Sequence, residues 1–115
     1  MPEGVEVSLS KAHHAGEYPA SIALYLTTNV LVAVVTAYVA TGRPCADGHK
    51  PVVGVSVALP RCYPLGSRVC IGGRWYVGED RTARRFDGRF DVFMGSRAEA
   101  LKWGKRTMEV TVVTK

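Results

Sequence analysis

Beyond residue 30, most of the chain consists of short apolar runs that are separated by glycine or proline. Several runs are rich in valine and isoleucine, which fit the pleated, half-buried surface of a β-sheet. Short strands at close spacing, with glycine-rich turns between them, are typical of a small β-barrel. We therefore expect strands at residues 31–39, 52–58, 68–71, 74–77 and 107–113.

Two of these runs predict a β-hairpin, because only two residues separate them. RVCI (68–71) and RWYV (74–77) are joined by Gly72 and Gly73. Glycine readily adopts the positive φ angles that two-residue hairpin turns require. The sequence therefore places these two strands side by side and antiparallel.

The last run, residues 107–113, alternates strictly between apolar and polar positions. Met108, Val110 and Val112 share one face of the predicted strand, and threonine or glutamate occupies the other. Such alternation is typical of a strand with one buried face. We expect this strand to close the sheet.

One helix is predicted, at residues 97–103. Ser96 can cap its N-terminus, Glu99 can complete a capping box, and Gly104 can end it. A serine followed three residues later by glutamate satisfies the free amides of a first helical turn, and glycine commonly follows a helix end. Trp103, on this helix, is expected in the core.

Residues 20–40 carry no charge and are just long enough to cross a bilayer. Their many β-branched residues and their polar residues favour two successive strands, separated near Thr27, Thr28 and Asn29. We therefore expect no stable membrane span.

At 115 residues, the chain has the size of one compact domain. Its net charge of +5 favours an anionic partner. We expect no nucleic acid as a partner, because no predicted helix has a concentrated basic face and no basic-aromatic surface pattern occurs. The N-terminus, with Glu3 where a secretory signal would be basic, does not resemble a classical signal peptide.

No metal site and no cofactor are expected. Cys45, Cys62 and Cys70 match no zinc-binding spacing. The sequence is equally consistent with three reduced cysteines and with a disulfide between two of them. His13, His14 and His49 lack an evident ligand cluster, and Asp47 precedes a glycine as expected in a turn. The oligomeric state stays open.

The stretch GEDRTARRFDGRFDVF (78–93) holds the most informative carboxylates. Asp80 and Asp91 lie eleven positions apart, and Asp87 precedes a glycine, which indicates a turn. If residues 89–93 form a strand, Phe90 and Val92 face the core. The other face then carries Arg89, Asp91 and Phe93.

Asp91 has two interpretations at this point. An ordinary aspartate has a pKa of about 3.9, so protonation near neutral pH requires a rise of about two units, or about 2.7 kcal/mol. Burial or the nearby charge of Asp80 would raise the pKa, whereas an arginine within about 4 to 6 Å would keep Asp91 ionised. The arginines concerned are Arg81, Arg84, Arg85 and Arg89.

Four stretches together resemble one known family, the three-aspartate (3D) domain. They are VTAYVATG, YPLGSRVCI, YVGED and RFDVFMGSRAEALKWGKRTMEVTVV, and they fall in this order within residues 35–113. The family includes the catalytic domain of membrane-bound lytic transglycosylase A, cell-wall stationary-phase factors and phage proteins. The resemblance implies a mainly β fold, a small six-stranded double-psi β-barrel with one or two short helices.

The resemblance also implies roles for individual residues. Asp91 matches the catalytic acid of the transglycosylase, and Asp80 matches a second, supporting aspartate. Thr36 and Tyr38 match the strand beside that site, and we expect them, with Arg89, to bind substrate. The chain departs from the pattern at Ala58 and Leu59, where the family usually has an aspartate, and at residues 81–83, where many members have Thr-Gly-Gly.

By this resemblance, the chain is expected to cleave peptidoglycan glycan strands as a lytic transglycosylase. One aspartate would act as acid and base, without a cofactor, and would yield a 1,6-anhydro product. The alternative is a non-catalytic glycan-binding or structural barrel that has lost one aspartate. Either function implies an extracytoplasmic location, at the cell wall or on a phage particle.

The domain organisation follows from the extent of these motifs. Residues 31–115 are assigned to the barrel, and residues 1–30 form an N-terminal segment outside the resemblance that can add a strand.

Overall fold

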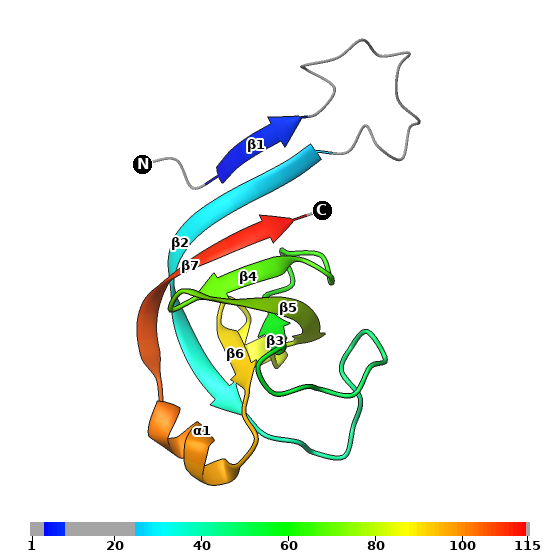
Figure 1. Cartoon of the computed structure of the whole chain (residues 1–115), viewed down its shortest axis with the longest axis vertical. Helices are drawn as coiled ribbons and strands as arrows, with labels where there is room; N and C mark the ends of the chain where they lie inside the picture. The colour runs from blue at the N-terminus through cyan, green and yellow to red at the C-terminus, as the bar shows by residue number, and fades with distance from the viewer. Residues whose placement is uncertain (1–3, 9–24, 115) are drawn as a thin grey trace.

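The structure is a computed structural model that describes residues 4–8 and 25–114. Within these residues the chain forms seven strands, one α-helix and one 3-10 turn (Figure 1). The strands are β1 (Gly4–Ser8), β2 (Tyr25–Tyr38), β3 (Ser56–Leu59), β4 (Arg68–Ile71), β5 (Arg74–Arg81), β6 (Phe90–Phe93) and β7 (Arg106–Thr114). The 3-10 turn is η3 (Arg84–Phe86), and the helix is α1 (Arg97–Trp103).

Six of the strands close into a barrel. The order is β2-β6-β3-β5-β4-β7, and β7 pairs with β2 to complete the ring. The pairs β2–β6 and β3–β5 are parallel, and the other four pairs are antiparallel. The predicted mainly β, six-stranded barrel with one or two short helices is therefore confirmed. β1 lies outside the ring and pairs with the first part of β2.

β2 is one strand of 14 residues, so the prediction of a break near Thr27, Thr28 and Asn29 is wrong. These residues pair with β1 on one side and with β7 on the other. Backbone hydrogen bonding on both sides holds the chain extended where its local sequence is polar. The sequence pattern predicts a strand that starts at residue 31, whereas β2 already begins at Tyr25. Residues 20–24 of the apolar stretch lie outside the described residues.

β3 is shorter than predicted, because the first part of the run 52–58 forms a tight turn. The amides of Val55 and Ser56 both donate to the carbonyl of Val52, at 3.1 and 2.9 Å. Gly54 has a φ of 80°, and the Val52 amide donates to the Ser56 hydroxyl at 2.8 Å. The valines of this turn, Val52, Val53 and Val55, are therefore exposed, although their composition favours a strand.

The predicted hairpin is confirmed as β4 and β5. Gly72 and Gly73 have φ angles of 59° and 79°, which suits a two-residue turn with positive φ at both positions. β5 continues beyond the predicted end at residue 77, through Asp80 to Arg81. The second half of β5 pairs with β3, which explains why it remains extended.

The helix and the last strand are also confirmed. The Ser96 hydroxyl accepts a hydrogen bond from the Glu99 amide at 3.2 Å, and Gly104 ends α1 with a φ of 67°. Trp103 is partly buried against the core, and its ring N–H donates to the Val35 carbonyl at 3.2 Å. In β7, Val110 and Val112 are fully buried, as the alternation predicts.

The core fills the barrel with mostly aliphatic side chains around the ring of Phe90. Burial of each large apolar side chain contributes about 1.5 to 3 kcal/mol. Phe93 is buried without belonging to the barrel core: its ring packs edge-on against that of Tyr38, with the ring centres 5.3 Å apart, and it lies against the loop between β2 and β3. In the hairpin, Tyr76 is buried and Trp75 is exposed.

In the described part of the chain, no helix has the length and apolarity needed to cross a membrane. All three cysteines are free: Cys45 is buried, Cys62 is exposed and Cys70 lies between these extremes.

Candidate functional site

Two aspartates and a threonine lie in one row across four neighbouring strands. Asp91 of β6 is in register with Thr36 of β2 on one side and with Ala58 of β3 on the other. Ala58 is in turn in register with Asp80 of β5. Directly opposed residues of paired strands project from the same face of a sheet. The core residues of these strands, such as Phe90 and Val57, belong to the opposite face.

A β-bulge in β5 aims Asp80 at this row. The register of β3 with β5 runs from Val57 opposite Gly78 to Ala58 opposite Asp80, so Glu79 is an extra residue. An extra residue reverses the faces of all residues that follow it in the strand. Without the bulge, Glu79 would oppose Ala58 and the Asp80 side chain would face the core.

Asp91 is partly buried and is held by one side chain. The Thr36 hydroxyl donates to Asp91 Oδ1 at 3.1 Å. Burial raises the pKa of the Asp91 carboxyl above its usual range; the Thr36 hydrogen bond opposes this rise, and the nearby charge of Asp80 adds to it. These are the conditions that keep a carboxyl group protonated closer to neutral pH.

Asp80 is bound by three donors. The Tyr38 hydroxyl donates to Oδ2 at 3.3 Å, and the amides of Ala46 and Arg81 donate to Oδ1 at 3.0 and 2.8 Å. Burial, followed by the charge of Asp80, raises the pKa of Tyr38 far above its usual range, so the phenol remains a donor. The arrangement fixes Asp80 between the barrel and the loop that contains Ala46.

Three of the four arginines of this region have contacts away from the two aspartates. Arg81 donates to the carbonyls of Pro60 and Tyr63 at 2.8 and 2.6 Å. The guanidinium groups of Arg85 and Arg89 lie 4.8 and 4.5 Å from the centre of the Phe86 ring. Within residues 4–8 and 25–114, neither Asp80 nor Asp91 has a salt-bridge partner.

Asp87 has the turn role that its sequence predicts. Its carboxylate accepts a hydrogen bond from the Arg61 amide at 2.8 Å and lies 3.7 Å from the Arg61 guanidinium. Asp87 is exposed and lies outside the Thr36–Asp91–Ala58–Asp80 row. A substitution of Asp87 therefore removes a carboxylate without changing the row.

Ala58 occupies the centre of the row, between the two aspartates. It is 2% exposed, and its methyl group contributes no polar atom. The motif pattern described above expects a third aspartate at Ala58 or Leu59; of these two positions, Ala58 is in register with both Asp80 and Asp91, whereas Leu59 is opposite Arg81 and is fully buried.

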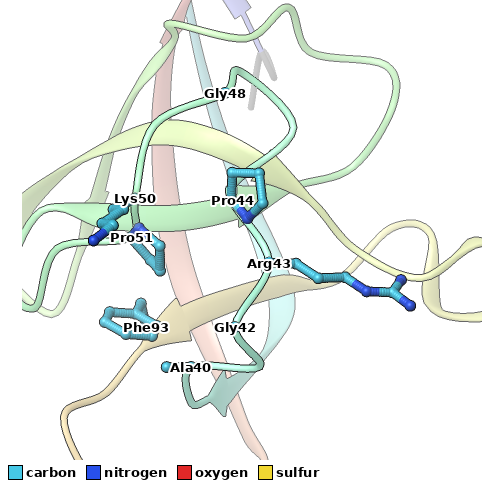
Figure 2. Close-up of a pocket in the computed structure, with 8 residues that line it drawn as sticks. All are labelled: Ala40, Gly42, Arg43, Pro44, Gly48, Lys50, Pro51 and Phe93. Atoms are coloured by element: carbon cyan, nitrogen blue, oxygen red, sulfur yellow. The ribbon is translucent and has the colours of Figure 1, made fainter.

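An open hollow of about 540 Å³ lies between Phe93 of β6 and the loop that joins β2 to β3, and none of Thr36, Ala58, Asp80 and Asp91 lines it (Figure 2). Phe93, two residues after Asp91 on β6, forms part of its wall. In this view Pro51 lies next to Phe93, Pro44 lies across the open space from Phe93, and Arg43 extends away from all three. The lining residues are Ala40, Gly42, Arg43, Pro44, Gly48, Lys50, Pro51 and Phe93.

Two side chains of this loop and one of β5 form a group that could ligate a metal ion. The ligand atoms of Asp47, His49 and Glu79 lie within 4.8 Å of one another. The His49 ring and the Asp47 carboxylate are 3.0 Å apart, and the Ser56 hydroxyl donates to Glu79 at 2.7 Å. Asp47 and His49 are exposed, and this hydrogen bonding accounts for the grouping without an ion.

The structure thus brings together four of the five predicted site residues: Asp91, Asp80, Thr36 and Tyr38. Arg89 instead contacts Phe86. Sequence reasoning missed the Ala46 amide, since a backbone donor to a distant side chain has no sequence pattern. Phe93 and Lys50 could have been suggested only by knowing how the loop folds over β6.

No protein-family model, no curated protein and no solved structure matches this chain. The likeness to the three-aspartate domain therefore rests on the sequence motifs within residues 35–113.

Proposed function

We propose that this protein cleaves the glycan strands of peptidoglycan as a lytic transglycosylase, with Asp91 as its acid and base. The observation that supports this most is the state of Asp91: it is partly buried, its pKa is raised by burial, and no arginine pairs with it in the described residues. A structural ion pair would have the opposite effect on the pKa.

In the proposed reaction, protonated Asp91 donates its proton to the glycosidic oxygen as the bond to C1 of the sugar breaks. The Asp91 carboxylate then takes the proton of the C6 hydroxyl of the same sugar, and the C6 oxygen bonds to C1. The products are a 1,6-anhydro sugar and a free hydroxyl on the leaving sugar, and Asp91 is protonated again. Because no water is activated, one carboxyl group can serve both steps, unlike the pair that hydrolytic glycosidases use.

The neighbours of Asp91 have positioning roles in this proposal. Thr36 donates to Oδ1 and so leaves Oδ2 of Asp91 to carry the catalytic proton. Asp80 does not touch the glycosidic bond in this scheme. Its negative charge adds to the raised pKa of Asp91, and Tyr38 and Ala46 keep it in place.

One observation favours a second function, a non-catalytic glycan-binding barrel. Ala58 leaves an apolar methyl group between the two aspartates, and neither Ala58 nor Leu59 supplies the further carboxylate that the resemblance suggests at one of these positions. A barrel that keeps the fold and loses this group would still present the hollow and the loop. Either function implies a location at the cell wall or on a phage particle.

Mass spectrometry of the fragments released from purified sacculi tests the proposal. The wild-type protein should release anhydro-muropeptides, and Asp91→Asn should lower the rate by at least about 100-fold, as is typical of the loss of a general acid. Asp87→Asn, which removes the carboxylate that contacts Arg61, is the matched control and should stay active.

Hydrolytic products without the anhydro ring would contradict the transglycosylase chemistry. If folded wild-type protein binds sacculi and releases nothing, the glycan-binding alternative replaces the enzyme.

A further inference from the structure

The hollow between Phe93 and the β2–β3 loop has the size of a ligand site. At about 540 Å³ it falls within the range of pockets that hold small molecules, about 300 to 1,000 Å³. Its lining contains no acidic residue; Arg43 and Lys50 are its two charged members. The hollow therefore suits a ligand that is neutral or negatively charged.

The walls offer flat apolar surface at one end. Phe93 contributes an aromatic ring, and Pro44 and Pro51 contribute rigid pyrrolidine rings. These three groups lie around a common space in Figure 2. Ligand sites that combine mostly apolar walls with a few polar groups orient a ligand through the polar ones. The apolar C–H face of a sugar ring fits such walls.

The hollow is connected to the aspartates by shared residues. Phe93 and Asp91 belong to the same four-residue strand, and Phe93 packs against Tyr38, whose hydroxyl binds Asp80. From the loop, the Ala46 amide also binds Asp80. A glycan strand that reaches Asp91 can therefore place a neighbouring sugar, or its substituent, in the hollow.

Lys50 is the cation best placed for an anionic group. In Figure 2 its side chain lies on the same side of the hollow as Phe93, whereas Arg43 extends away. In the described residues Lys50 has no salt-bridge partner, and the nearby carboxylate of Asp47 is paired with His49 at 3.0 Å. Lys50 is thus a free, exposed charge at the edge of an apolar hollow.

We propose that the hollow is a subsite for a carboxylate-bearing sugar: the ring packs against Phe93, Pro44 and Pro51, and Lys50 binds the carboxylate of its substituent. This proposal rests on the proposed function and deepens it, because it makes the protein selective for peptidoglycan over neutral glycans of the same linkage. An N-acetylmuramyl residue with a peptide substituent has this chemistry, and an N-acetylglucosamine residue lacks it.

Binding of a soluble fragment, followed by NMR, tests the subsite without requiring catalysis. The probe is N-acetylglucosaminyl-N-acetylmuramyl dipeptide, and its methyl ester is the matched ligand without the charge. The acidic probe should bind about two- to fivefold more tightly than the ester, because an exposed ion pair contributes up to about 1 kcal/mol. Amide shifts should be concentrated in residues 40–51 and β6.

Lys50→Gln should remove this preference and leave binding of the ester unchanged. Lys102→Gln, which removes the same charge from exposed α1, is the matched control and should keep the preference. Lys50→Arg should keep most of it. Equal binding of acid and ester by the wild type, or equal losses in Lys50→Gln and Lys102→Gln, would overturn the proposal.

The two proposals fail in different ways. Selective binding of the acidic probe without release of anhydro-muropeptides from sacculi would support the subsite and overturn the enzymatic function. Release of anhydro-muropeptides together with equal binding of acid and ester would support the enzymatic function and overturn the subsite.

Discussion

At the scale of single residues, the two aspartates of the row have different surroundings. Both are partly buried, but Asp80 accepts three hydrogen bonds, two of them from backbone amides, whereas Asp91 accepts one, from Thr36. Separate roles for two nearby carboxyl groups are commonly set by such a difference in environment. In the proposed function, Asp91 is accordingly the acid and Asp80 the positioning residue.

The raised pKa of Asp91 predicts a pH-dependent cost to folding. The folded protein binds the proton of the Asp91 carboxyl more tightly than the unfolded chain does. The protonated carboxyl therefore contributes its full stabilisation below about pH 3.9, and this stabilisation is lost as the pH rises through the raised pKa. The amide introduced by Asp91→Asn keeps an oxygen that can accept from Thr36 but does not ionise. The free energy of unfolding of this variant should therefore increase, relative to wild type, between pH 4 and neutral pH.

Urea unfolding of both proteins across this pH range measures the difference. Each pKa unit of the rise corresponds to about 1.4 kcal/mol. A difference that stays constant, or that falls with increasing pH, would show that Asp91 is not an acid with a raised pKa.

At the scale of elements, the bulge in β5 connects the core with the site. Gly78 faces the core directly before the extra residue Glu79, and Asp80 follows on the outer face. A Cβ at Gly78 would overlap the side chain of Leu59, which is fully buried. The absence of a side chain at Gly78 thus allows β3 and β5 to pack closely where the register changes.

Gly78→Ala should destabilise the protein by about 1 to 3 kcal/mol or more, as overpacking of a core does. Gly95→Ala is the matched control, because a Cβ added at Gly95 would lie 3.4 Å from the nearest atom, in the Val53 side chain. The φ of Gly95 is also not in the left-handed region. Its effect should stay within about 0.5 kcal/mol. Thermal or urea unfolding measures both, and equal small effects would contradict the close approach of Leu59.

The elements also show which features local sequence predicts. The Gly72–Gly73 pair predicted the β4–β5 hairpin, and Ser96 with Gly104 predicted α1. Both predictions succeed because turns and helix caps depend on neighbouring residues. The continuity of β2 through Thr28 and the turn at Val52 depend on pairing partners far along the chain or on one side-chain hydrogen bond. Alternation of residues does not contain that information.

At the scale of the whole molecule, closure of the barrel is what creates the site. β2 pairs with β7 from Thr27 to Val35, which joins the first strand of the barrel to the last. Three sheet pairings then bring together Thr36, Ala58, Asp80 and Asp91. The strand pattern and the motif resemblance predicted the barrel, and the resemblance singled out Asp80 and Asp91. The bulge in β5, the Ala46 amide as a donor to Asp80, and the hollow could be recognised only in the folded structure.

The central claim is that Asp91 is an acid whose pKa is raised by burial and, to a smaller extent, by Asp80. The most direct measurement is a titration of the Asp91 carboxyl carbon by NMR in the wild type and in Asp80→Asn. We expect a pKa above the ordinary value of about 3.9 in the wild type, and a lower pKa in Asp80→Asn because the neighbouring negative charge is gone. A wild-type pKa at or below the ordinary value would contradict the claim.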